Sequence, residues 1–514
     1  MKKFLAILMA AMMLLAMTSA FAETATTYTI TVPASETGVK HTYEVYQIFV
    51  GDLATSNGST ILSNVVWGKN AKLPEGAKVG DAVAEAVLST LTSTSGTDKE
   101  KLAVIANYVD ITGTAFTTVK DGASVSVPAG YYLIKDANNS LDNTHDAYTT
   151  YIVNVCKSVE LAPKSVYPTV DKEVQDETGD AEAGHTDGWK ETADHDLFET
   201  FSFRLTAKLP ADERYADYTT YAVTFHDTMS EGITFENIVS VTVDGKTLTA
   251  DQYTTTGTDN LAYGGTWTLK IADLKAIDGV NLVDSADVVV VYNAHLNEKA
   301  QIDNESVTST TNENSVYLTY SNNPNAAGEG KTPVDYVWVF TYVVNNTKYA
   351  NSAASGNELA GAGFTLYDST GAVVPLCKIG DDYYVYDGKT VPSTATPVED
   401  YEMVTTSNGK FNIKGLDHGT YTLKETTVPA GYNKVDDVTI TISALHSENA
   451  DAKAASTTLD SNSKMNNDII NKSGATLPET GGIGTTLFYL LGGLMTAGSA
   501  LILVVRRRAD AEEE

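Results

Sequence analysis

The side chains that most often carry chemistry are few and widely spaced in this 514-residue chain. Its two cysteines, Cys156 and Cys377, cannot build a disulfide framework or a multi-cysteine zinc site. They fall in different segments, so we expect two lone buried thiols rather than a cross-link. The eight histidines are scattered along the chain. No metal site and no cofactor are therefore predicted.

Sequence motifs of familiar enzyme classes are also missing. Residues 328–332 echo the end of a phosphate-binding loop, but the first glycine that such a loop needs would fall at Asn325. The chain has no G-x-S-x-G segment and no Cys/His pairing of the kind that proteases use. The chain therefore lacks the set of catalytic residues that an extracellular hydrolase needs, and we predict that it is not a turnover enzyme.

The charge balance describes an acidic chain of ordinary globular composition. It has 35 Lys and Arg against 66 Asp and Glu, a formal net charge of −31. Nucleic acid is excluded as a partner, because phosphate contacts need clustered Lys and Arg. Hydrophobic residues make up 42% of the chain, which argues against wholesale disorder.

The N-terminus has the pattern of a secretory signal peptide over residues 1–22. Lysines at positions 2 and 3 precede an apolar run to about Met17, and small residues of an A-x-A site follow. Cleavage between Ala22 and Glu23 would export the remainder. A membrane anchor is the alternative, but the apolar run is short.

The C-terminus carries a second apolar run, at residues 483–505, which is long enough to span a bilayer. Arginines at 506–508 follow at once, and basic residues stay on the cytoplasmic side. The chain is therefore expected to enter the membrane from outside and stop. Directly before this run stands the pentapeptide Leu477-Pro478-Glu479-Thr480-Gly481.

Between its ends the sequence predicts strands, which must position any functional side chains. Short runs rich in Val, Thr, Tyr and Ile, broken by Gly, Asn and Asp, are typical of all-β sandwiches; examples are 28–32, 42–50, 131–135, 221–225, 288–292, 316–320, 363–367 and 421–425. One helix is expected around 79–91. Prolines mark joints that divide the exported chain into segments 23–165, 166–330 and 333–472, followed by a terminal segment, 473–514.

The terminal segment resembles the cell-wall sorting signal of Gram-positive surface proteins, in which an LPxTG pentapeptide, an apolar helix and a basic tail occur in that order. By this resemblance a sortase cleaves between Thr480 and Gly481 and leaves an acyl-enzyme on Thr480. The implied location is the cell wall, after transient membrane anchoring through 483–505. An ordinary single-pass membrane protein is the alternative.

Motifs of the exported segments resemble those of Gram-positive major pilins. Residues 421–432 resemble the pilin E-box, with Glu425 at its centre, and 359–367 resemble an early strand of a CnaB-like domain. Residues 225–235 and 314–324 resemble a CnaA-like domain. Residues 159–164 resemble the pilin motif, although Leu161 and Ala162 depart from its usual V-x-V-Y-P-K form. The chain is thus similar to the backbone subunit of a sortase-assembled pilus, a rod of tandem immunoglobulin-like β-sandwiches.

In this family an intramolecular Lys–Asn isopeptide bond staples a domain. The resemblance implies a Lys348–Asn471 bond promoted by Glu425 in the third segment, which would tie its first strand to its last. It also implies a Lys172–Asn314 bond promoted by Asp227 in the second segment. Solvated surface lysines, a turn aspartate and an edge-strand glutamate are the plainer alternatives. The first segment has no acid at the E-box position and no lysine in its opening strands, so no such bond is predicted there.

The chemistry of such a bond follows from the residue types. Burial disfavours the ammonium form and lowers the pKa of the lysine, which makes its amine a nucleophile. A carboxyl buried in the same core has a raised pKa, so it can stay protonated, polarise the asparagine carbonyl and move protons. The amine attacks and ammonia leaves, once per molecule.

Polymerisation is the other chemistry that the resemblance implies. Lys164 would resolve the acyl-enzyme on Thr480 of another subunit, and Lys157 and Lys172 are its rivals. Such head-to-tail amides do not close into a ring and generate a fibre. The implied partners are pilus-class and housekeeping sortases, identical subunits and peptidoglycan, with minor pilins and host or surface ligands as further candidates. A monomeric wall-anchored adhesin or a minor tip or base pilin is the alternative, but a monomeric adhesin has no need of Lys164.

Overall fold

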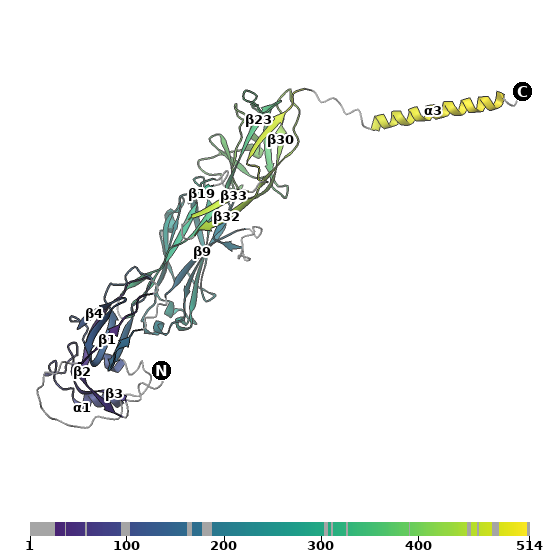
Figure 1. Cartoon of the computed structure of the whole chain (residues 1–514). Helices are drawn as coiled ribbons and strands as arrows, with labels where there is room; N and C mark the ends of the chain where they lie inside the picture. The colour runs from purple at the N-terminus through teal and green to yellow at the C-terminus, as the bar shows by residue number, and fades with distance from the viewer. Residues whose placement is uncertain are drawn as a thin grey trace. The chain divides into compact units, whose positions relative to one another are not determined.

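The chain is built mainly of strands, as the alternating pattern predicts, with a short helix α1 (Glu85–Ser93) and a long helix α3 (Ile483–Asp510) (Figure 1). The all-β fold class is confirmed. The computed structural model describes residues 26–35, 38–56, 59–93, 103–161, 167–176, 188–302, 307–309, 312–324, 327–389, 391–449, 454–459, 462–474 and 483–510.

The described chain divides into two compact units. Unit one comprises Met1–Thr341 and Leu445–Thr458, and unit two comprises Tyr342–Ala444 and Leu459–Glu514. A joint was expected near residues 330–333, but strand β22 (Asp335–Phe340) pairs with the preceding strands of unit one, so the units divide after Thr341.

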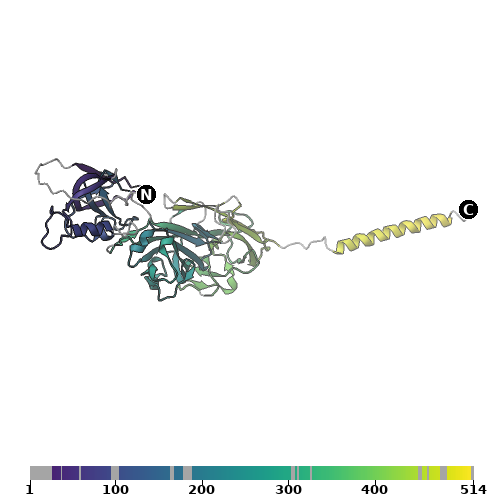
Figure 2. The ribbon, with the colours of Figure 1, turned by 90° about the horizontal axis from the view of Figure 1, so that it is seen from below.

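The N-terminal part of unit one has two sheets around apolar clusters. The larger sheet has the strand order β3-β2-β6-β7, with β4 paired to β2, and contains β2 (Thr42–Ser56), β3 (Ser59–Trp67), β4 (Thr117–Lys120), β6 (Gly130–Asp136) and β7 (Thr150–Val155). The smaller sheet has the order β5-β1-β8 and contains β1 (Thr27–Thr31), β5 (Ser124–Pro128) and β8 (Val159–Glu160). Helix α1 packs Val87, Leu88 and Leu91 against the cluster that holds Trp67. Figure 2 shows this helix beside the strands of the N-terminal part of the chain. The helix begins later than expected, because Ala82 bridges to Val66 in an extended segment.

The remaining strands of unit one form two larger sheets. Their orders are β10-β9-β12-β18-β14-β15 and β11-β22-β20-β13-β17-β16, with β21 on β20. The first sheet contains β9 (Thr169–Gln175), β10 (Trp189–Lys190), β12 (Phe201–Leu209), β14 (Ile233–Val243), β15 (Lys246–Thr247) and β18 (Ala286–Leu296). The second contains β11 (Thr192–Asp194), β13 (Val223–Met229), β16 (Thr254–Thr256), β17 (Gly265–Ile271), β20 (Glu313–Ser321), β21 (Glu329–Lys331) and β22.

A hairpin from late in the chain completes unit one. Strands β32 (Ala444–Asn449) and β33 (Ala454–Leu459) form a small sheet with β19 (Val307–Ser309), in the order β19-β33-β32. The hairpin is held to unit one by the ion pair between His446 Nε2 and Asp194 Oδ2, 3.3 Å apart, whose side chains are both buried.

Unit two is a sandwich of a six-stranded and a four-stranded sheet. The six-stranded order β27-β25-β26-β29-β23-β34 contains β23 (Tyr342–Ala350), β25 (Leu376–Ile379), β26 (Asp382–Val385), β27 (Thr396–Pro397), β29 (Ile413–Leu416) and β34 (Asn466–Asn471). The four-stranded order β28-β24-β30-β31 contains β24 (Gly363–Tyr367), β28 (Met403–Val404), β30 (Gly419–Thr427) and β31 (Val438–Ile442). The first and last strands, β23 and β34, are parallel neighbours.

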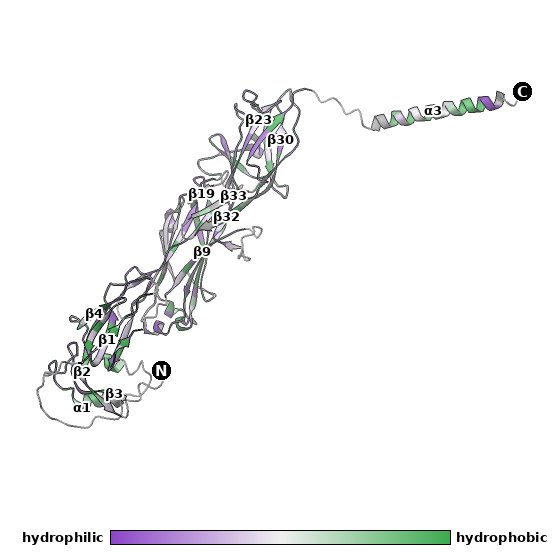
Figure 3. Cartoon of the chain, viewed as in Figure 1, coloured by the Kyte–Doolittle hydropathy of each residue, from purple (hydrophilic) through white to green (hydrophobic). Residues whose placement is uncertain are grey.

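Helix α3 confirms the apolar segment expected near the C-terminus. Residues Leu487–Arg508 are long and apolar enough to cross a membrane. Figure 3 shows hydrophobic residues along this helix and a hydrophilic stretch near its C-terminal end, where the arginines lie.

A buried ionic triad lies in the N-terminal part of unit one. His41 Nδ1 is 2.7 Å from Asp136 Oδ1, and His41 Nε2 is 3.2 Å from Asp146 Oδ2. The amide and hydroxyl of Thr149 donate to the other oxygen of Asp136, at 2.7 and 2.9 Å. Burial lowers the pKa of His41, but the hydrogen bonds and charges of the two carboxylates outweigh it and raise that pKa to about 9.

The triad predicts an alkaline loss of stability. Because the pKa of folded His41 lies above its ordinary value of 6.5, the protonated ring stabilises unit one fully below pH 6.5, and that contribution is lost as the pH rises through 9. Between pH 7 and 10 this loss is about 2–3 kcal/mol of unfolding free energy. Urea unfolding at pH 7 and at pH 10 should show this loss of unfolding free energy in the wild type and not in His41→Gln. The control is His226→Gln, and equal pH dependence in wild type and His41→Gln would contradict the prediction.

Candidate functional site

The lysine, aspartate and asparagine singled out in the second segment meet inside unit one. Lys172 lies on β9 of one sheet, while Asp227 on β13 and Asn314 on β20 belong to the facing sheet. Side chains of a strand point alternately to its two faces, so Asp227 shares the inner face with Phe225, and Asn314 shares it with Val316. The structure therefore brings together three residues from distant points of the sequence.

The polar atoms of this unit-one centre are in direct contact. Lys172 Nζ donates to Asp227 Oδ2 and, at 3.1 Å, to the hydroxyl of Tyr292 on β18. That hydroxyl donates to Asp227 Oδ2 at 3.0 Å and accepts from Asn314 Nδ2 at 2.6 Å. All four side chains are fully buried. The lysine amine and the carboxamide are thus held around one tyrosine hydroxyl.

Burial sets the protonation of this centre. It lowers the pKa of Lys172, although the adjacent Asp227 opposes the change. It raises the pKa of Asp227, although Lys172 opposes that change too. Both directions favour a neutral amine beside a neutral carboxyl, and a neutral amine is the nucleophilic form of lysine.

The three residues singled out in the third segment meet inside unit two. Lys348 on β23 and Asn471 on β34 come from adjacent parallel strands, and Glu425 on β30 reaches them from the facing sheet. Lys348 Nζ donates to Asn471 Oδ1 and lies 3.2 Å from Glu425 Oε1. Asn471 Nδ2 donates to the same Glu425 oxygen at 2.7 Å. In this unit-two centre one carboxyl touches both the amine and the carboxamide.

The unit-two centre is also shielded from solvent. All three side chains are fully buried, and Lys348 Nζ lies 5.0 Å from the centroid of the Phe364 ring. Burial lowers the pKa of Lys348, while the charge of Glu425 opposes the change. The second oxygen of Glu425 is fixed by the amide of Val435 at 3.0 Å. The amine is therefore desolvated directly beside an asparagine carbonyl.

Other predicted site residues lie outside the described residues. These are the acceptor candidate Lys164, the pentapeptide 477–481 with Thr480, and the cleavage residues Ala22 and Glu23. Of the rival acceptors, Lys172 is fully buried and cannot reach an enzyme-bound acyl group, whereas Lys157 is exposed. The two cysteines are free, but only Cys377 is buried; Cys156 is half-buried, in contrast to the expectation.

Two buried residues were missed by the sequence reasoning. Tyr292 joins the unit-one centre, and the alternating pattern of 286–296 could have placed its ring inward but not its contacts. Lys190 is buried beside Asp176, with Nζ 2.9 Å from Oδ2. Among the buried residues of the described chain, the lysines are Lys172, Lys190 and Lys348, and none lies in the N-terminal sheets.

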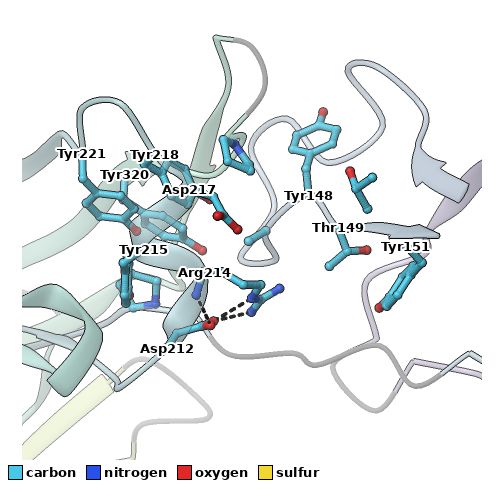
Figure 4. A pocket seen from close by; sticks show the side chains of 14 residues that line it. Tyr148, Thr149, Tyr151, Asp212, Arg214, Tyr215, Asp217, Tyr218, Tyr221 and Tyr320 are labelled. Atoms are coloured by element: carbon cyan, nitrogen blue, oxygen red, sulfur yellow. Dashed lines mark hydrogen bonds and ion pairs between the residues drawn. The ribbon is translucent and has the colours of Figure 1, made fainter. Parts of the chain in front are cut away.

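A separate pocket of about 460 Å³ lies in unit one. Figure 4 shows Tyr215, Tyr218, Tyr221 and Tyr320 on one side and Thr149 and Tyr151 on the other, with Arg214 between them. Arg214 Nε donates to Asp212 at 2.7 Å. The pocket lining includes no residue of either lysine centre.

Three family models match successive parts of the chain. Residues 199–324 match the Gram-positive pilin backbone subunit 2, Cna-B-like domain, so the description differs from the CnaA-like resemblance expected there. Residues 345–456 match the SpaA prealbumin-like fold domain, and 469–512 match the LPXTG cell wall anchor motif. No curated protein sequence matches the chain.

A solved structure supports the fold. The T6 backbone pilin of serotype M6 Streptococcus pyogenes, described as a modular three-domain structure, is 18% identical, with coverage of 87% of this chain and 99% of that chain and a TM-score of 0.50. The full-length major pilin SpaD from Corynebacterium diphtheriae is 14% identical, with coverage of 89% and 99% and a TM-score of 0.47. At 18% identity the likeness to the T6 pilin is one of fold alone. With its backbone, prealbumin-like and anchor matches, the chain belongs to the Gram-positive pilins that carry an LPXTG cell-wall anchor.

Proposed function

We propose that the chain is the shaft subunit of a covalently polymerised pilus and that each of its two units is stapled by a self-formed Lys–Asn bond. The observation that carries the staples is the pair of fully buried centres, each with a lysine of lowered pKa in contact with a buried acid and close to a buried asparagine. The matched backbone-pilin domain and wall-anchor motif support the role in the shaft.

Each staple would form by the same balanced step. The neutral lysine Nζ attacks the asparagine Cγ, and an N–C bond forms as the bond from Cγ to Nδ2 breaks. The buried carboxyl passes a proton from Nζ toward Nδ2, and the nitrogen leaves as ammonia. The bonds would join Lys172 to Asn314 and Lys348 to Asn471. Asp227 and Glu425 are regenerated, but the chain is consumed as its own substrate, so it is not a turnover enzyme.

Assembly would use the two ends of the exported chain. A pilus-class sortase joins the Thr480 carbonyl of one subunit to Lys164 of the next, and a housekeeping sortase transfers the base of the fibre to peptidoglycan. The domain assignment belongs to the same proposal: a signal peptide at 1–22, an N-terminal sandwich at 23–165, a second sandwich from 166 to Thr341 that also takes Leu445–Thr458, a third over the rest of the chain to residue 472, and a sorting signal at 473–514. Minor pilins and host or surface ligands are further proposed partners.

Intact-mass measurement tests the staples. The full chain, expressed in a host without a pilus-class sortase and extracted in detergent, should weigh two ammonia molecules less than its processed sequence. Glu425→Gln should restore one ammonia and Asp227→Asn the other, because each removes one buried acid. The exposed acids Glu399 and Asp251 supply matched controls, Glu399→Gln and Asp251→Asn, which should keep the full deficit. A wild-type mass equal to the plain processed sequence would refute the proposal.

A further inference from the structure

The two lysine centres differ in how the acid reaches the asparagine. In unit two, Glu425 accepts a hydrogen bond directly from Asn471 Nδ2 at 2.7 Å. In unit one, the described structure has no hydrogen bond between Asp227 and Asn314. Instead, the Tyr292 hydroxyl lies between them, 3.0 Å from Asp227 Oδ2 and 2.6 Å from Asn314 Nδ2.

The strand register explains this gap. Asp227 on β13 is directly opposite Val316 on β20, and Asn314 is opposite Met229. Asp227 and Asn314 are therefore diagonal neighbours, which are farther apart than directly opposed residues. Aspartate is also one methylene shorter than the glutamate of the other centre. A third polar group is needed to connect this acid to the carboxamide.

Tyr292 is held firmly enough to provide that connection. Its side chain is fully buried, and its ring meets the edge of Trp267 at 5.0 Å between centroids. Phe203 and Phe235 lie 5.3 and 5.6 Å away on the same measure. Burial, followed by the charge of Asp227, raises the pKa of Tyr292 well above its usual value, so its hydroxyl stays neutral and can both donate and accept.

Asn314 depends on this hydroxyl. The Asn314 Nδ2 donates to Tyr292, while Asn314 Oδ1 is buried and has no hydrogen-bond partner among the described residues. Lys172 Nζ also donates to the same hydroxyl at 3.1 Å. Tyr292 thus touches the attacking nitrogen, the departing nitrogen and the acid at once.

We propose that Tyr292 is a catalytic residue of the unit-one centre and relays a proton from Asp227 to the departing nitrogen of Asn314. This inference rests on the proposed Lys172–Asn314 bond. As the new N–C bond forms, Asp227 takes a proton from Lys172 Nζ and gives its own to Tyr292, which passes its hydroxyl proton to Asn314 Nδ2. The bond from Cγ to Nδ2 breaks, ammonia leaves, and both Tyr292 and Asp227 return to their starting forms.

Tyr292→Phe tests the relay, because it removes only the hydroxyl and keeps the ring. The full chain is unfolded in denaturant before bond formation is complete, refolded, and followed by intact mass and by peptide mapping of the two cross-links. Loss of a general acid–base group should slow the Lys172–Asn314 bond at least about 100-fold. The Lys348–Asn471 bond should form at the wild-type rate. Tyr221→Phe, at another fully buried tyrosine of unit one, is the matched control and should form both bonds normally.

A second measurement separates chemistry from folding. Lys172 in refolded Tyr292→Phe should stay protected from an amine-acetylating reagent, as expected for a lysine that remains buried. Exposure of Lys172 to the reagent would assign Tyr292 a purely structural role and overturn the relay. Formation of both bonds at the wild-type rate in Tyr292→Phe would overturn it as well. Absence of both bonds from the wild type would instead refute the proposed function on which the relay rests.

Discussion

Glu425→Gln is expected to leave Lys348 and Asn471 unjoined and to lower the unfolding free energy of unit two by about 5 kcal/mol, because a cross-link restricts the unfolded chain. The linked residues are 123 positions apart, so the bond closes a loop that includes most of the unit. For a domain of this size that loss corresponds to a melting temperature about 10–20 °C lower. Calorimetry of the full chain would measure it, with Glu399→Gln as the control.

A second variant separates the lost bond from the charge that it leaves behind. The double variant Lys348→Met, Glu425→Gln also removes the cross-link, but it leaves neither an unpaired amine nor an unpaired acid in the buried site. Because an uncompensated buried charge is costly, the double variant should be less destabilising than Glu425→Gln alone. Melting temperatures equal to the wild type in both variants would contradict a covalent staple in unit two.

Lys164→Arg is expected to abolish the high-mass pilus ladder in cells that contain the cognate sortase. Arginine keeps the positive charge but stays protonated, so it cannot resolve the acyl-enzyme on Thr480 as an amine can. The chain should remain at the wall as a monomer, because anchoring needs only Thr480. Immunoblots of wall extracts boiled in detergent would show this result.

The matched control for Lys164 is an exposed lysine a few residues earlier in the chain. Lys157→Arg should leave the ladder intact, since it changes the same chemical group near the same joint. Loss of the ladder in Lys157→Arg with its persistence in Lys164→Arg would move the acceptor to Lys157. Persistence of the ladder in both variants would contradict the proposed linkage between Lys164 and Thr480 of the neighbouring subunit.

The local pattern of apolar and polar residues predicted the fold class well, because strands of a β-sandwich alternate between buried and exposed residues. The inward positions of Asp227 and Asn314 follow from that alternation. The helix near the C-terminus follows instead from its uninterrupted apolar run. Lys172 is different, because it begins a run of three buried residues in β9, where alternation gives no direction. Its selection depended on a family resemblance, and its bond stays a prediction.

The features that sequence could not supply depend on contacts between distant strands. The position of Tyr292 between Asp227 and Asn314 requires β18 of one sheet to face β13 and β20 of the other. The membership of β22 and of the hairpin β32–β33 in unit one is likewise fixed by pairing partners far away in the chain. Prolines near 324 and 333 mark loops in the sequence, but loops do not determine which sheet the next strand joins.

The hairpin β32–β33 would also fix an order of events during the proposed secretion. Under that proposal the chain emerges N-terminus first, yet Leu445–Thr458 of unit one follow most of unit two in the sequence. Unit one therefore stays incomplete until residue 458 has crossed the membrane. Unit two must wait longer, because its last strand, β34, ends at Asn471, shortly before the apolar helix at which the proposed translocation would stop. Both units are thus finished almost together, at the moment when the chain is still tethered and the sorting pentapeptide first becomes available.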